Sequence, residues 1–308
     1  MKCSIVAAAA IILSLPAVQA QQPDTALLYI HYKFSHLRDT SNRANPYKEN
    51  MVLVIGKNAA VYRSYQRQLE NAAAKKNIQQ QISAGGPVQV NLHFTGSGSE
   101  YFQYPNDHKL VRKESLFGNF LVTESLPVIN WQVTADTTTL GSLHCQKATG
   151  HFKGRDYIAW FCPDLPLHVG PWELNGLPGV IVEAYDDKKE VQFLFDGVEN
   201  VAPAAQAESA AATPPGNQGN MPPPLPGMED MNNDPAIIKL PDDATKTTDK
   251  EFAKLQAAFR KDPNAFAQSM MAARNGGMAG DNGPRPKMDF RAAPSQVINN
   301  PIELPEKP

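Results

Sequence analysis

The sequence has little net charge, few cysteines and no long apolar run in its interior. Its 29 basic and 31 acidic residues leave a formal net charge of −2. The isoelectric point near 6.4 argues against a nucleic-acid-binding surface. Beyond the N-terminus no apolar stretch reaches about 18 residues, so we expect no membrane span in the mature chain. Hydrophobic residues still make up 42% of the sequence, which is enough for a sizeable core.

The first 20 residues predict a secretory signal peptide. Lys2 gives a positive start, Val6–Leu15 is apolar but too short to span a bilayer, and Pro16 interrupts it. Small residues at Val18 and Ala20 fit a cleavage site before residue 21. The alternatives are an uncleaved anchor or a lipoprotein. We therefore expect export across the inner membrane, to the periplasm or to association with the outer membrane.

Cleavage there leaves two cysteines, Cys145 and Cys162, in an oxidising compartment. The segments 144–152 and 155–162 read as strands around Lys153-Gly154, which fits a two-residue hairpin turn. Residues whose numbers sum to 307 would then face each other, so the cysteines would be opposite at a non-hydrogen-bonded position. The sequence predicts a structural cross-strand disulfide. A redox-active pair is the alternative, although the C-x-x-C arrangement is missing.

Residues 21–200 predict one antiparallel β domain. Apolar and polar residues alternate over 25–35, and a glycine-containing turn at 56–58 separates two further strand patterns. Residues 64–83 predict a helix or a polar excursion, ended by glycine and proline. The other expected strands are 88–94, 101–104, 108–113, 119–124, 129–134, 179–185 and 191–195. Because crossover helices are few, the fold class is α+β, mainly β, with a curved antiparallel sheet.

Beyond residue 200 the composition changes, because 16 of the 26 prolines lie there. Residues 201–236 predict a disordered linker rich in Pro, Ala and Met. Residues 237–308 predict a helical extension: a capping box at Thr248 and Glu251 starts one helix, and Asp262 and Pro263 start a second. The stretch 297–304 predicts a final edge strand that returns to the sheet.

Around residues 170–181 the chain reads GPWELNGLPGVI. This segment resembles the motif of the GLPGLI family, exported envelope proteins of Gram-negative bacteria, with Val180 in place of Leu. The resembling hexapeptide is Gly176, Leu177, Pro178, Gly179, Val180 and Ile181. Further segments that resemble the family are 45–51, 126–131, 144–149, 154–161, 251–255 and 299–304, so the resemblance covers most of the mature chain. It implies a mostly antiparallel sheet, an envelope location and a partner near outer-membrane uptake systems, but no reaction or catalytic residue.

The motif itself favours a structural role. Its glycines and proline are turn formers, and no helix with a Lys-Ser or Lys-Thr start follows, as a phosphate cradle would need. Trp172 is interpreted as a buried anchor, with an exposed ligand platform as the alternative. Candidate partner contacts are Tyr29, Trp131, Trp160 and Trp172, although a place in the core is the favoured interpretation for each of them.

Signatures of enzyme chemistry are scarce. The seven histidines form no zinc motif, and no G-x-S-x-G occurs. A methionine cluster suggests Cu(I) as an alternative, although its spacing is irregular; its members are Met221, Met228, Met231, Met270, Met271, Met278 and Met288. We therefore expect no cofactor and a non-enzymatic binding or assembly factor with a protein or peptide partner at the outer membrane. An envelope hydrolase with a dispersed site, or a copper-handling protein, is the alternative.

Overall fold

The structure is a computed structural model, which describes residues 23–84, 96–116, 118–201, 234–275 and 297–306. The predicted signal peptide, the expected strand 88–94 and nearly all of the predicted linker lie outside these residues.

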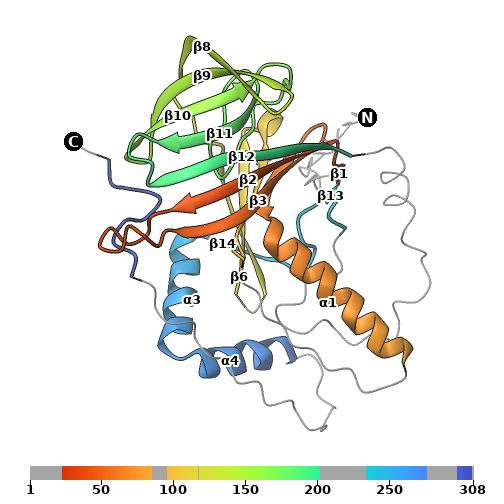
Figure 1. The fold of residues 1–308 in the computed structure, drawn as a ribbon. Helices are drawn as coiled ribbons and strands as arrows, with labels where there is room; N and C mark the ends of the chain where they lie inside the picture. Colours follow the sequence, from red (N-terminus) through yellow and green to blue (C-terminus); the bar gives the residue numbers. More distant parts are fainter. Residues whose placement is uncertain (1–22, 85–95, 117, 202–233, 276–296, 307–308) are drawn as a thin grey trace, which may run out of the picture.

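A large curved sheet of twelve strands dominates the molecule (Figure 1). Its neighbours pair antiparallel except at one edge, where β14 runs parallel to β7. In spatial order the strands are β14 (Thr245–Thr247), β7 (Asn119–Ser125), β6 (Lys109–Ser115), β5 (Glu100–Tyr104), β4 (Ala60–Ser64), β3 (Tyr47–Ile55), β2 (Leu28–His36), β12 (Val191–Asn200), β11 (Val180–Asp186), β10 (Arg155–Cys162), β9 (Leu143–Phe152) and β8 (Gln132–Leu140). A separate ribbon pairs β1 (Asp24–Thr25) with β13 (Ile237–Ile238). The predicted class, α+β and mainly β with an antiparallel sheet, is confirmed.

The connection between β7 and β8 explains the curvature of the sheet. These strands lie near opposite ends of the strand order, yet only residues 126–131 join them. Seven residue steps from Ser125 to Gln132 reach at most about 25 Å. The sheet must therefore roll so that its two ends approach each other, as Figure 1 shows.

Both faces of the central strands are buried, which accounts for the unbroken apolar run Met51–Ile55. One face belongs to the larger core cluster, which contains Leu53, Tyr32 and Phe193. The other belongs to a second cluster, with Val52 and Val54 packed near Phe102 and Ile238. A strand with two buried faces needs no polar alternation. The sheet is therefore covered on both sides at its centre.

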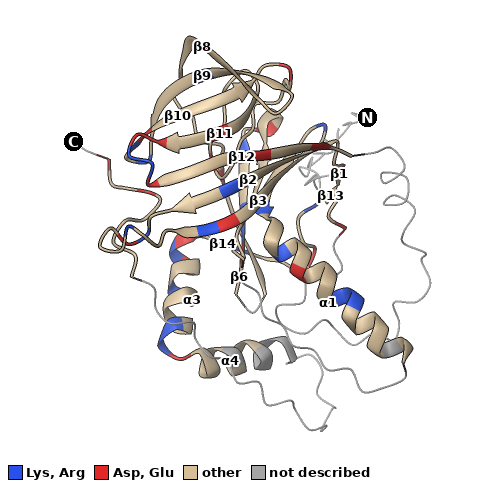
Figure 2. Ribbon diagram, in the orientation of Figure 1, with Lys and Arg blue, Asp and Glu red and all other residues tan. Residues whose placement is uncertain are grey.

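The described residues form three α-helices outside the sheet: α1 (Tyr65–Ser83), α3 (Asp249–Lys261) and α4 (Pro263–Asn275). The predicted capping box is confirmed, since Thr248 Oγ1 accepts from the Glu251 N–H and the Glu251 carboxylate accepts from the Thr248 N–H. Phe252 then packs against Phe120 of β7. Figure 2 shows charged residues on α1, on α3 and on several strands, among them β3 and β12. No helix among the described residues is both long and apolar enough to cross a membrane.

One predicted element is wrong. Residues 297–304 form no strand and no sheet ladder. Pro301 and Pro305 lack N–H donors, and the carbonyl groups nearby accept from side chains instead of from a neighbouring strand. The segment is an irregular peptide that Arg155 holds against the sheet.

Candidate functional site

The motif segment packs on the core face of the curved sheet. It connects β10 to β11, and its side chains Trp172, Leu174 and Leu177 are buried in the larger core cluster. Within the hexapeptide, Gly176 and Pro178 are exposed, whereas the other four residues are buried. The segment is therefore part of the core rather than a loop on the surface.

Three polar side chains form hydrogen bonds between this segment, the sheet and the connection 126–131. The Gln103 amide of β5 donates to the carbonyl groups of Gly170 (2.8 Å) and Trp172 (2.9 Å). The Asn175 amide donates to the Pro127 carbonyl (3.0 Å), in the connection that joins the two ends of the sheet. The Tyr32 hydroxyl donates to the Ile181 carbonyl (2.7 Å). These bonds satisfy backbone carbonyl groups that the core would otherwise leave unpaired.

Two motif glycines have positive φ angles for different reasons. At Gly179, with φ +153°, an added Cβ would lie 2.2 Å from the Cys162 carbonyl oxygen. At Gly176, with φ +88°, an added Cβ would meet nothing within 4 Å. Gly179 therefore allows a close backbone approach, and Gly176 allows only an unusual turn.

Trp172 lies in the core, as the anchor interpretation expects. It is 2% exposed, stacks near Phe193 and packs against Phe152. Its φ of +56° is uncommon for a bulky residue and costs about 1–2 kcal/mol. The packing of the ring into the centre of the molecule compensates for this strain. The side chain offers almost no surface to a partner.

Glu173 is a motif residue for which no role was predicted. Its side chain is 2% exposed, and its Oε2 lies 2.6 Å from Lys153 Nζ. Its Oε1 is buried and has no hydrogen-bond partner among the described residues. Burial raises the pKa of Glu173, while Lys153 opposes that shift. The sequence does contain a signal for a buried charge here, because Glu173 is an acidic residue between Trp172 and Leu174.

More charged groups gather beside Glu173, from β6, β7 and the start of α3. Arg112 pairs with Asp249 and with Glu114, at 3.1 Å from the latter. A hydrogen bond with Asp249 and partial burial raise the pKa of Glu124 to about 7. This carboxyl group can exchange a proton near neutral pH. Among the described residues, no three His, Cys, Asp or Glu side chains are arranged to hold a metal ion.

On the other side of the β9–β10 turn, Arg155 holds the C-terminal segment. We call residues 299–306 together with Arg155 and Asp186 the C-terminal clasp. Arg155 is 4% exposed and lies 2.6 Å from Asp186. It also donates to Asn300 Oδ1 (2.8 Å) and to the carbonyl groups of Pro301 (2.7 Å) and Ile302 (2.9 Å). The guanidinium group thus has partners on all three nitrogens.

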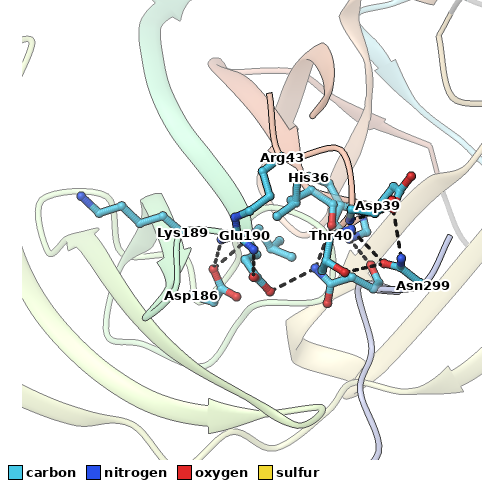
Figure 3. A network of polar contacts seen from close by, with 12 residues as sticks. His36, Asp39, Thr40, Arg43, Asp186, Lys189, Glu190 and Asn299 are labelled. Atoms are coloured by element: carbon cyan, nitrogen blue, oxygen red, sulfur yellow. Dashed lines mark hydrogen bonds and ion pairs between the residues drawn. The ribbon is translucent and has the colours of Figure 1, made fainter. Parts of the chain in front are cut away.

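Figure 3 shows the polar network that continues from this clasp to the end of β2. His36 Nε2 lies 2.8 Å from the Asn300 carbonyl oxygen. The Asn299 amide donates to Asp39, and its oxygen accepts from the Thr40 N–H. Desolvation lowers the pKa of His36 to about 4, with Arg38 and Arg155 adding to the shift. The network is therefore built around a neutral imidazole.

The cysteine prediction is half right. The β9–β10 register follows the predicted sum of 307, from Phe152 opposite Arg155 to Gln146 opposite Phe161. Cys145 and Cys162 are nevertheless free buried thiols, so the structure does not contain the predicted disulfide. The paired register ends one position before the cysteines, and the Cys145 thiol donates to the Leu143 carbonyl (3.5 Å). Burial raises the pKa of Cys145 to about 11, which keeps it protonated.

The remaining predicted contact residues lie on β2, on β10 and in the connection before β8. Trp131 is partly buried and donates its indole N–H to the Asn175 carbonyl (2.7 Å). Tyr29 is half-buried on β2, and burial raises its pKa. Trp160 is partly exposed on β10, opposite Lys147 and Glu183 of the neighbouring strands. Trp131 and Trp160 pack against the core cluster that contains Trp172, whereas Tyr29 packs against the second cluster.

Within the described ranges, His144 and His151 do not share a partner. His144 and His151 pair with separate carboxylates, Asp164 for the first and Asp156 and Glu306 for the second. Of the clustered methionines, Met270 and Met271 lie in α4, and the others lie outside the described residues.

No family model and no curated protein matches the chain. Solved structures do match, among them PNGF-II in two crystal forms. The P21 form has a TM-score of 0.43 and the C2 form 0.44, each at 9% sequence identity over 74% of this chain. The chain spans about a third of the length of that protein, because the match covers 32% of it.

Proposed function

We propose that this chain is an exported cell-envelope protein of the GLPGLI type that binds a protein or peptide partner at the outer membrane without catalysing a reaction. Burial of the motif supports this proposal, because residues 170–181 are used for packing and internal hydrogen bonds. A partner must then contact the surface of the sheet.

The single observation that carries the proposal is the outer edge of β8. This nine-residue strand ends the sheet, and no strand of the described chain pairs with its outer side. Most of its residues are exposed, and four are threonine. Exposed edge strands are templates for the addition of an extended peptide. Trp160 lies two strands away and supplies an aromatic group on the same part of the sheet.

The register identifies which N–H groups of β8 face outward. Leu140 and Leu143 close a two-residue turn as a hydrogen-bonded pair, so the pair of Thr138 and Cys145 is also hydrogen-bonded. The N–H of Thr139, between them, points away from β9. Proline at this position removes an outward donor and leaves the β8–β9 ladder intact.

The test compares Thr139→Pro with Thr139→Val in the mature protein. Both are cross-linked in native envelopes, and the captured partner is then used as reciprocal bait. We expect one partner to be recovered in both directions, and its yield to fall roughly tenfold with Thr139→Pro but not with Thr139→Val. Equal yields with both variants would exclude strand addition at β8. N-terminal sequencing and fractionation of the wild type test export and location in the same samples.

One observation favours the hydrolase alternative. The pKa of Glu124 is raised to about 7 beside Asp249, and such a carboxyl group can act as a general acid or base. If the protein is a hydrolase of this kind, Glu124→Gln removes its activity and leaves partner capture unchanged. Partner capture that fails with Thr139→Pro while Glu124→Gln is silent supports the binding function.

A further inference from the structure

A cavity of about 400 Å³ lies beside α1, away from the motif and from β8. One wall is the exposed helix, and the opposite wall comes from the end of β4, from the start of β5 and from Pro235. Four basic side chains line it: Arg63, Arg67, Lys75 and Lys76. Figure 2 shows basic residues along α1.

The charge of this cavity contrasts with that of the whole chain. The cavity has four basic residues and one acidic residue, Glu100, which leaves a formal charge of 4 − 1 = +3. The whole chain has a net charge of −2. Glu100 is already held by Lys113, at 2.9 Å, so it neutralises the other cations only in part. A concave wall with charge of one sign attracts ligands of the opposite sign.

Amide and guanidinium groups in the same wall have unused hydrogen-bonding capacity. Gln68 Oε1, Asn71 Oδ1 and Arg63 Nε are buried and have no hydrogen-bond partner within the part of the chain that the structure describes. Buried polar atoms in folded proteins are normally paired. Amide side chains can present either oxygen or nitrogen, and hydroxyl groups can bond to both.

We propose that this cavity binds a phosphate group with neighbouring hydroxyl groups, as in a sugar phosphate or in the headgroup of a hydroxylated phospholipid. The cations Arg63, Arg67, Lys75 and Lys76 hold the phosphate. Gln68 and Asn71 bind the hydroxyl groups. The volume of about 400 Å³ accommodates one sugar ring with its phosphate.

The test uses the purified mature full-length chain and calorimetric titration with glucose 6-phosphate at low ionic strength. Glucose and inorganic phosphate are the partial probes. We expect glucose 6-phosphate to bind more tightly than either, and its binding to weaken as salt is added. Vesicles of phosphatidylcholine with or without phosphatidylglycerol form a second arm: binding to the charged vesicles alone identifies a lipid headgroup, and binding to free glucose 6-phosphate alone identifies a soluble ligand.

Lys75 and Lys76 are exposed, so their substitution leaves the chain folded. The double variant Lys75→Gln/Lys76→Gln should weaken binding by roughly tenfold or more, and Asn71→Leu should reduce the preference for glucose 6-phosphate over inorganic phosphate. Lys250→Gln, an exposed helical lysine outside the cavity, is the matched control and should change nothing. No binding in either arm, binding that Lys75→Gln/Lys76→Gln leaves intact, or inorganic phosphate binding as tightly as glucose 6-phosphate would overturn the proposal.

Discussion

The C-terminal clasp and the α1 cavity are both polar, but they differ in whether their buried polar atoms have hydrogen-bond partners. In the clasp, Arg155 has partners on all three nitrogens, and Asp186 also accepts from two backbone N–H groups. In the cavity wall, buried atoms of Gln68 and Asn71 have no partner among the described residues. A satisfied buried network fixes one arrangement of the chain. A wall with unused capacity is suited to a ligand, which supplies the missing partners.

The largest expected effect is the loss of stability when Arg155, the cation of the clasp, is removed. Arg155→Met leaves Asp186 buried without its counter-charge, which costs about 3–5 kcal/mol of the free energy of unfolding. Lys75→Met, in the exposed cavity wall, should change that free energy by less than about 0.5 kcal/mol. Urea denaturation of both variants measures the difference. Similar values for the two would mean that the clasp is no more structural than the cavity.

Substitution of the motif glycines should give the next largest loss of stability. Gly179→Ala brings a Cβ against the Cys162 backbone in addition to an unfavourable φ, so we expect a loss of about 3 kcal/mol. Gly176→Ala has the unfavourable φ without a clash and should cost about 1 kcal/mol. Thermal and urea unfolding compare the two. If Gly176→Ala proved the more damaging, the packing around the motif would not be what this region depends on.

The smallest effect is a pH dependence of stability at His36, which contacts Asn300 of the clasp. Burial lowers the folded-state pKa of His36 to about 4, below its ordinary value of 6.5. As pH falls, His36 is therefore protonated near pH 6.5 in the unfolded chain but only near pH 4 in the folded chain. Stability contributed by neutral His36 is fully present above pH 6.5 and falls by about 2 kcal/mol as pH drops to 5.

Urea unfolding between pH 4 and pH 8 measures this slope. The variant His36→Gln should lose the part of the slope that lies between pH 6.5 and pH 4. His151 serves as a comparison, because hydrogen bonds with Asp156 and Glu306 raise its pKa and its contribution is lost on the alkaline side. An unchanged acid slope in His36→Gln would assign the effect to other groups.

Local patterns predicted much of the sheet. The hairpin of β9 and β10 has the register that its two-residue turn requires, and the hairpin around residues 56–58 pairs Ile55 with Ala60 as the pattern indicates. The capping box at Thr248 is also visible in four consecutive residues. These features depend on neighbours in the sequence, so short-range rules reach them.

The candidate site was much less accessible to such rules. Glu173 pairs with Lys153 twenty residues away, and its neighbours Arg112 and Glu303 come from distant segments. The expected strand at residues 297–304 failed for the same reason, because Arg155 captures that segment from 145 residues away. Among the aromatic candidates, Trp172 is buried as the anchor interpretation expects, whereas no local pattern distinguished Tyr29, Trp131 and Trp160 by burial.

The sequence by itself determined the antiparallel character of the sheet, its hairpin registers and the start of α3, because these follow from side-chain periodicity and turn geometry. Only the tertiary structure decided that the motif packs in the core, that β8 is an edge and that α1 lines a basic cavity. These outcomes depend on how far the sheet rolls and on which distant polar groups find partners, and no local pattern encodes either.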